Sequence, residues 1–185
     1  MFQLRNLPNL LSVLRILLVP PVVYYMLQQQ YMPALVLFVI AGVTDSLDGW
    51  LAKHFNWQSR LGEILDPLAD KLLLVSSYIV FAWLDHLPIW LVACVFIRDI
   101  IIVAGGVAYR IFFGEVDILP TYISKLNTLM QIVLIAVVLV SLAWLSISPI
   151  VITGLIWTVF MTTILSGVVY IYLWGMRAVN QLRKG

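Results

Sequence analysis

Apolar residues run along this chain in long stretches that short polar breaks interrupt. The breaks fall at Gln28 to Gln30 with Pro33, at Asp85 to Pro88, near Gly114 to Pro120, and at Ser146 to Pro149. A helix needs about 20 mostly apolar residues to cross a bilayer, and the stretches between breaks approach or exceed that length. The pattern therefore predicts six transmembrane helices, over 10–28, 33–51, 67–84, 88–110, 123–145 and 150–175.

The composition supports a membrane protein. Of the 185 residues, 63% are hydrophobic and 11% are charged, whereas soluble domains have about 25% charged residues. We therefore expect an all-α integral membrane protein that forms a single domain over 1–185. The formal net charge of +2 is too balanced for a nucleic-acid binder. The leucines around Arg5 and Arg15 fit either an interfacial amphipathic segment or the ordinary start of the first span.

Basic residues predict the orientation in the membrane. The connections near 30, 86 and 147 contain no lysine or arginine, while most basic residues fall at the opposite helix ends, among them Lys53, Arg60, Arg110 and Arg177. Because loops rich in Lys and Arg stay in the cytoplasm, both termini are expected there. The N-terminus lacks an Arg- and Ser-rich transit pattern, which favours a bacterial cytoplasmic membrane.

Acidic residues cluster at the end of the second predicted span and at the start of the third. The window from Thr44 to Lys71 holds five of the nine acidic residues. The second span reaches bilayer length only by including Asp45 and Asp48, and the third needs Asp66 and Asp70 in its first turns. Carboxylates at such depth require a counter-charge, a water-filled cavity or a metal ion. This region is therefore the candidate functional site, at the cytoplasmic ends of the second and third helices.

The spacing of these carboxylates favours a metal site. Asp45 and Asp48 are three residues apart, and Asp66 and Asp70 are four apart, so each pair lies on one helical face. Four carboxylates without His or Cys form an all-oxygen donor set that suits Mg²⁺ or Mn²⁺, with room for two ions. A proton or cation pathway, as in transporters, remains the alternative interpretation.

The motif is Asp45-Ser46-Leu47-Asp48-Gly49-Trp50-Leu51-Ala52-Lys53, then eight residues to Gly62, three to Asp66 and three to Asp70. It resembles the signature of the CDP-alcohol phosphotransferase family at every spacing. The resemblance implies a six-helix homodimer that transfers a phosphate-linked group from a CDP-linked lipid to an alcohol and releases CMP.

The same resemblance implies roles for individual residues. Asp45, Asp48, Asp66 and Asp70 would hold the divalent ions, and Asp70 would also act as the general base. The cytidine diphosphate site would be lined by Asp48, Gly49, Ala52, Lys53 and Gly62. Lys53 departs from the arginine usual in the family, and a lysine lacks the bidentate fork of a guanidinium.

Residues outside the signature bear on the acceptor alcohol. Leu7 to Arg15, Arg98-Asp99 and Pro120 to Thr128 resemble the cardiolipin synthases of the family, which implies CDP-diacylglycerol as donor and phosphatidylglycerol as acceptor. In the phosphatidylglycerophosphate synthases, which use glycerol 3-phosphate, a second lysine is typical where this chain has Asn127. One cation fewer favours a phosphodiester acceptor over a dianionic monoester. The candidates for binding the acceptor phosphate are Arg98, Lys125, Arg110 and Arg15.

Three other functions remain open from the sequence. The first is a phosphatidylglycerophosphate synthase, which differs in the acceptor only. The second is a cation transporter built on the acidic cluster, which would carry metal- or proton-coupled flux without releasing CMP. The third is a non-catalytic membrane scaffold, for which Asp70→Asn would change nothing. Arg98 and Asp99 also have a simpler interpretation, as a structural ion pair within the fourth span.

Overall fold

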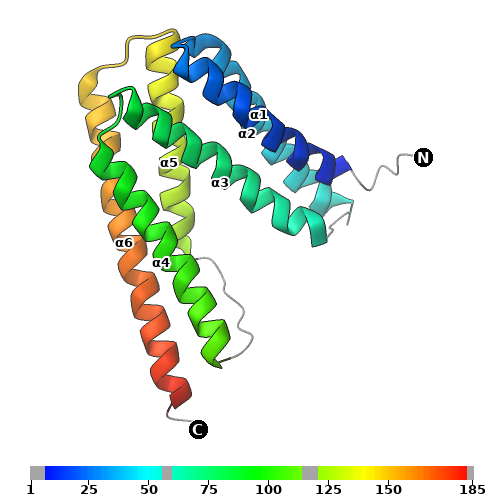
Figure 1. The fold of residues 1–185 in the computed structure, drawn as a ribbon, viewed down its shortest axis with the longest axis vertical. Coiled ribbons are helices and arrows are strands. Elements are labelled where there is room, and N and C mark those ends of the chain that lie inside the picture. Colours follow the sequence, from blue (N-terminus) through cyan, green and yellow to red (C-terminus); the bar gives the residue numbers. More distant parts are fainter. Residues whose placement is uncertain (1–6, 56–59, 114–120, 183–185) are drawn as a thin grey trace. The chain divides into compact units, whose positions relative to one another are not determined.

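The protein is all-helical in the residues that the computed structural model describes, which are 7–55, 60–113 and 121–182 (Figure 1). Every helix expected from the hydrophobic pattern is present. Most ends differ by one to three residues, but the third helix begins seven residues earlier and the sixth ends seven residues later than predicted. The helices are α1 (Leu7–Leu27), α2 (Tyr31–His54), α3 (Arg60–Trp83), α4 (Ile89–Phe113), α5 (Tyr122–Ala143) and α6 (Pro149–Leu182).

Five of these helices are long and apolar enough to cross a membrane. The exception is α3, which we expected to be the third span. Its first half contains Glu63, Asp66, Asp70 and Lys71, and these charges offset the apolar second half. A sixth span and the orientation of the helices therefore remain predictions.

The described chain forms two compact units. The first comprises residues 1–86 and 135–147, and the second comprises 87–134 and 148–185. In the first unit, α1 packs against both α2 and α3, and apolar side chains such as Met26, Phe38 and Phe81 are buried. Many other large apolar side chains on these helices are exposed, among them Leu17 and Val36, as expected of surfaces that face lipid.

A polar contact ties the start of α2 to the connection after α3. The hydroxyl of Tyr31 lies 2.7 Å from Nε2 of His86, whose ring also packs edge-on against Phe81. Burial lowers the pKa of His86, and the neighbouring Asp85 acts in the opposite direction. These contacts give His86 a structural role, which the sequence had not indicated.

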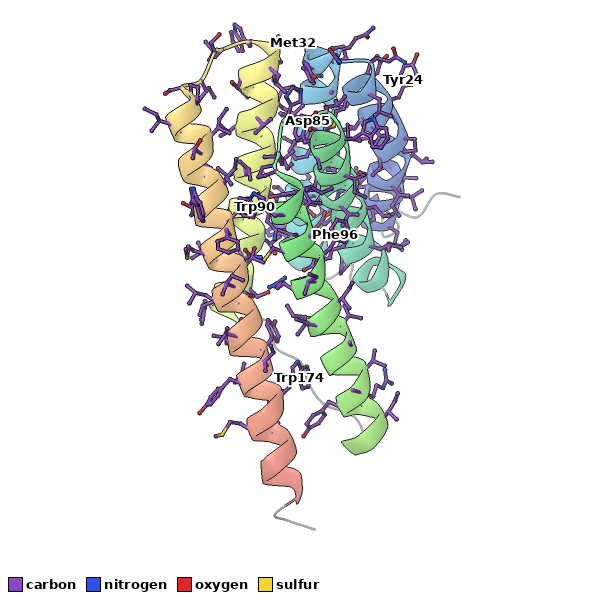
Figure 2. The ribbon with its side chains drawn as sticks, turned by 60° about the vertical axis from the view of Figure 1, so that its left-hand side comes forward. Tyr24, Met32, Asp85, Trp90, Phe96 and Trp174 are labelled. Atoms are coloured by element: carbon purple, nitrogen blue, oxygen red, sulfur yellow. The ribbon has the colours of Figure 1, made fainter. Side chains whose placement is uncertain are left out.

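In the second unit, α4 packs along α6. Trp90 on α4 contacts Trp157 and Phe160 on α6. Further along, the Trp174 side chain points from α6 toward α4 (Figure 2), where it stacks near Tyr109. Gly105 on α4 makes this approach possible, because a Cβ atom there would lie only 2.9 Å from the Trp174 ring. The two helices therefore pack closely through a small residue, as is common in membranes.

Gly105→Ala is expected to destabilise the protein by about 1–3 kcal/mol, since the added methyl group overpacks the contact with the rigid Trp174 ring. Thermal unfolding in detergent measures the change. Gly154→Ala is the matched control, because Gly154, like Gly105, lies inside a helix but has nothing within 4 Å of an added Cβ. Equal melting temperatures for the two variants would contradict the packing argument.

Candidate functional site

The first unit contains a buried arginine surrounded by carboxylates. Arg15, on α1, has a side chain that is 1% exposed. Its Nη1 atom lies 2.7 Å from Oδ1 of Asp45 on α2 and 2.5 Å from Oδ1 of Asp70 on α3. Its Nη2 atom donates to Oδ2 of Asp48. One guanidinium therefore joins three helices through three of the four predicted metal ligands.

The fourth carboxylate is bound one helical turn away. Ser12 precedes Arg15 by three residues, so both side chains lie on the same face of α1. The Ser12 hydroxyl donates to Oδ1 of Asp66. As the spacing predicted, the two aspartates of α2 lie on one helical face, and so do the two of α3. Both faces contact α1, which we had not expected.

The charges in this cluster explain its geometry. A buried guanidinium remains charged at any relevant pH and needs anionic partners. Asp48 is also buried, at 2% exposure, whereas the Asp45 and Asp70 side chains are each 45% exposed. Among the described groups, the Nε atom of Arg15 has no hydrogen-bond partner. The cluster is therefore closed around Arg15 on one side and reaches solvent on the other.

The donor chemistry fits a hard divalent cation, because Mg²⁺ and Mn²⁺ prefer carboxylate oxygens. The positions of the carboxylates, however, are not those of a metal site. No three His, Cys, Asp or Glu side chains within the described ranges are grouped so that they could hold a metal ion. The oxygens converge on the Arg15 guanidinium instead. The four aspartates remain the predicted ligands, and their present partners are Arg15 and Ser12.

The predicted cytidine diphosphate site is described only in part. For Gly49, Ala52 and Lys53 the structure describes the helical backbone alone. Gly62, in α3, is buried. Asp48 has the contact with Arg15 given above.

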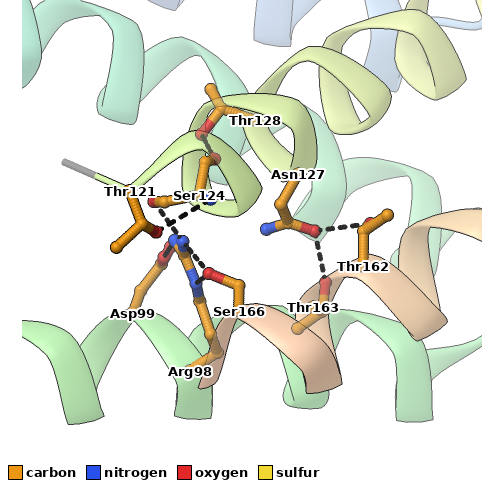
Figure 3. A network of polar contacts seen from close by, with 9 residues as sticks. All are labelled: Arg98, Asp99, Thr121, Ser124, Asn127, Thr128, Thr162, Thr163 and Ser166. Atoms are coloured by element: carbon orange, nitrogen blue, oxygen red, sulfur yellow. Dashed lines mark hydrogen bonds and ion pairs between the residues drawn. The ribbon is translucent and has the colours of Figure 1, made fainter. Parts of the chain in front are cut away.

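The second unit holds a separate polar network around Arg98 (Figure 3). Arg98, on α4, is 6% exposed. Its Nη1 atom lies 2.9 Å from Oδ1 of Asp99, and its Nε atom donates to the Ser166 hydroxyl on α6 at 3.1 Å. Its Nη2 atom donates to both Ser166 and Ser124, the latter on α5. The structural ion pair considered from the sequence is therefore present, and the guanidinium also links three helices.

Asn127 extends this network along α5. It is fully buried, and its Oδ1 atom accepts hydrogen bonds from the hydroxyls of Thr162 and Thr163, both at 2.9 Å. The Thr162 hydroxyl also lies 3.0 Å from the carbonyl oxygen of Thr158 and 3.1 Å from that of Val159. The Nδ2 atom of Asn127 has no hydrogen-bond partner among the described groups, and in Figure 3 it points toward the side where Arg98, Ser124 and Ser166 meet.

The polar side chains that α6 contributes to this network were not predicted from the sequence. Thr162, Thr163 and Ser166 lie at spacings of three and four residues within an apolar span, so one face of that span is polar. This regularity was the available signal. Of the other predicted acceptor ligands, Lys125 and Arg110 are exposed, and the Lys125 ammonium lies 6.0 Å from the centre of the Tyr122 ring. Arg15 belongs to the acidic cluster of the first unit.

Comparison with known sequences decides the family. The sequence profile of the CDP-alcohol phosphatidyltransferases matches residues 5–173, which include the acidic cluster and the Arg98 network. The chain belongs to this family. The predicted resemblance is thereby confirmed.

Curated relatives in the family carry two different activities in their names. A rat cardiolipin synthase (CMP-forming) is 37% identical over 147 residues, which cover 71% of this chain and 49% of the rat protein. A CDP-diacylglycerol–glycerol-3-phosphate 3-phosphatidyltransferase of Aquifex aeolicus is 36% identical over 104 residues, which cover 55% of this chain and 58% of the relative. The chain thus spans about half the length of these relatives.

Proposed function

We propose that the protein is a membrane-bound transferase that moves a phosphatidyl group from CDP-diacylglycerol to phosphatidylglycerol, forming cardiolipin and CMP. The observation that carries this proposal is the convergence of Asp45, Asp48 and Asp70 on one point of the first unit, within a chain of this family. The donor is argued from the family, and the acceptor from Arg98 and Asn127.

The acidic cluster supplies the groups that such a transfer needs. In this proposal Asp45, Asp48, Asp66 and Asp70 hold one or two Mg²⁺ or Mn²⁺ ions, which would neutralise the diphosphate of the donor. Asp70 accepts the proton of the attacking hydroxyl, as its half-exposed carboxylate can be reached from solvent. The hydroxyl oxygen bonds to the β-phosphorus, and the bond to CMP breaks.

Arg98 and Asn127 support an acceptor with one phosphate charge. Arg98 is a buried cation of the second unit, and part of its charge is already balanced by Asp99. Asn127 adds a neutral amide that contacts two threonines. One partly balanced cation and one neutral donor suit a phosphodiester better than a dianionic monoester. In the proposal, exposed Lys125 and Arg110 add further positive charge for the headgroup.

A specific finding also favours a second candidate, phosphatidylglycerophosphate synthase. The Aquifex aeolicus relative, named for glycerol 3-phosphate, is nearly as identical to this chain as the rat cardiolipin synthase is. The two candidates share the donor, the ions and the release of CMP. They differ only in the acceptor, so a single assay separates them.

The test is CMP release by the purified protein with CDP-diacylglycerol and Mn²⁺ or Mg²⁺. Phosphatidylglycerol and glycerol 3-phosphate are offered in separate reactions. We expect release with phosphatidylglycerol only. Release with glycerol 3-phosphate only would overturn the acceptor assignment and keep the transferase. Release with neither, together with ion flux in vesicles, would favour the cation transporter.

The proposal also covers the membrane, the oligomeric state and the orientation of the enzyme. We place it in a bacterial cytoplasmic membrane as a homodimer, with both termini and the acidic cluster on the cytoplasmic side. The five apolar helices support the membrane assignment. The distribution of basic residues supports the orientation. Cysteine accessibility from each side of sealed vesicles tests it.

A further inference from the structure

The acidic cluster contains its own cation. Arg15 is 1% exposed and contacts Asp45, Asp48 and Asp70. These oxygens are the ones that the proposed function assigns to divalent ions. A guanidinium and a metal ion cannot share the same point of convergence, because both require close contact with the same carboxylate oxygens and both are positively charged.

We propose that Arg15 is an internal counter-ion that holds the cluster together in the absence of divalent ions, and that ion binding displaces it. This inference rests on the proposed function, since it takes the aspartates to be metal ligands. Arg15 is thus a positioning residue. It acts through the carboxylates, which it keeps turned toward one another until ions replace it.

The contacts of Arg15 support both states. With the guanidinium in place, the half-exposed carboxylates of Asp45 and Asp70 remain open toward solvent. An ion can therefore approach from that side. One guanidinium cannot neutralise four carboxylates, and two divalent ions can. The exchange therefore lowers the repulsion among the carboxylates. The Ser12 contact with Asp66 and the packing of α1 against α2 and α3 do not depend on the guanidinium, so α1 has other contacts that hold it when Arg15 leaves.

The first experiment measures Mn²⁺ affinity by electron paramagnetic resonance on the full chain in detergent, without substrate. When a site must first release an internal competitor, its apparent affinity equals the intrinsic affinity multiplied by the fraction of molecules in which the site is open. We expect Arg15→Gln to bind Mn²⁺ about tenfold more tightly than the wild type. Arg15→Lys keeps a competing charge and is expected to fall nearer the wild type.

The second experiment needs no variant and therefore avoids any folding defect. Phenylglyoxal modifies accessible arginines, and mass spectrometry of the peptides gives the extent at each position. We expect Arg15 to react slowly without divalent ions and several-fold faster when Mn²⁺ is added. Arg110, which is exposed, serves as the reference for reagent activity.

The outcomes separate this inference from the proposed function. Equal Mn²⁺ affinities in the wild type and Arg15→Gln, with Arg15 equally protected in both conditions, would overturn the displacement and keep the metal site. Weaker Mn²⁺ binding in Arg15→Gln would also overturn it, because Arg15 would then assist the ion. Absence of Mn²⁺ binding in every variant would overturn both the inference and the metal part of the proposed function.

Discussion

Asp70→Asn is expected to lower the rate of CMP release by about a thousandfold, within the range that removal of a general base produces. The amide keeps the shape of the carboxylate but cannot take a proton from the acceptor hydroxyl. Arg15 would retain Asp45 and Asp48 as partners, so the helices should stay together. Steady-state CMP release with saturating acceptor measures the effect, and Mn²⁺ binding shows whether the site survives.

Asp85→Asn is the matched control for this variant. Asp85 lies in the connection after α3 and has a positive φ of 60°, a conformation that asparagine adopts readily. The same chemical change there should leave CMP release unaltered. Unaltered release in Asp70→Asn would remove the assigned role from Asp70, whereas absence of release in the wild type as well would favour the scaffold hypothesis.

Arg98→Gln is expected to reduce both stability and acceptor binding. The Asp99 carboxylate, whose side chain is 11% exposed, would lose its ion-pair partner. Removing one member of a buried ion pair costs roughly 3–5 kcal/mol. If Arg98 also binds the acceptor phosphate, the KM for phosphatidylglycerol should rise about tenfold, which corresponds to the loss of one charge-assisted hydrogen bond. Thermal unfolding and acceptor titration measure the two effects.

The double variant Arg98→Gln/Asp99→Asn separates the two roles of Arg98. It also removes the negative charge of Asp99, so most of the lost stability should return. The increase in KM for the acceptor should persist, since the guanidinium is still missing. A KM that returns to the wild-type value together with the stability would show that Arg98 acts only in the ion pair with Asp99.

The sequence predicted the helices and the composition of the acidic cluster because both follow from local patterns. Apolar run length determines where a helix can cross the bilayer, and spacings of three or four residues determine which side chains share a face. The third span shows the limit of this argument. Its apolar half predicted the helix correctly. The helix as a whole is too charged to count among the apolar spans, because its other half contains Glu63, Asp66, Asp70 and Lys71.

The partners of the buried charges could not be predicted, because they lie on helices far apart in the sequence. Arg15 is one of the predicted acceptor ligands. The structure places it 2.5 Å from Asp70, a residue 55 positions away. Asn127 had been interpreted as a missing lysine, and its hydrogen bonds to Thr162 and Thr163 depend on how α6 packs against α5. Spacing within one helix carries no information about such contacts.

The Arg98 ion pair has a consequence for how the chain enters the membrane. Helices are released into the bilayer in order of synthesis, and an arginine near the middle of a helix makes insertion less favourable by about 2.5–3.5 kcal/mol. Asp99 is adjacent to Arg98 in the chain and pairs with it at 2.9 Å, so α4 carries its neutralising charge with it. Arg15 has no such neighbour in α1, and its partners emerge from the ribosome only with α2 and α3. The first helix therefore depends on later ones to balance the charge of Arg15, whereas α4 carries an anionic partner for Arg98 within itself.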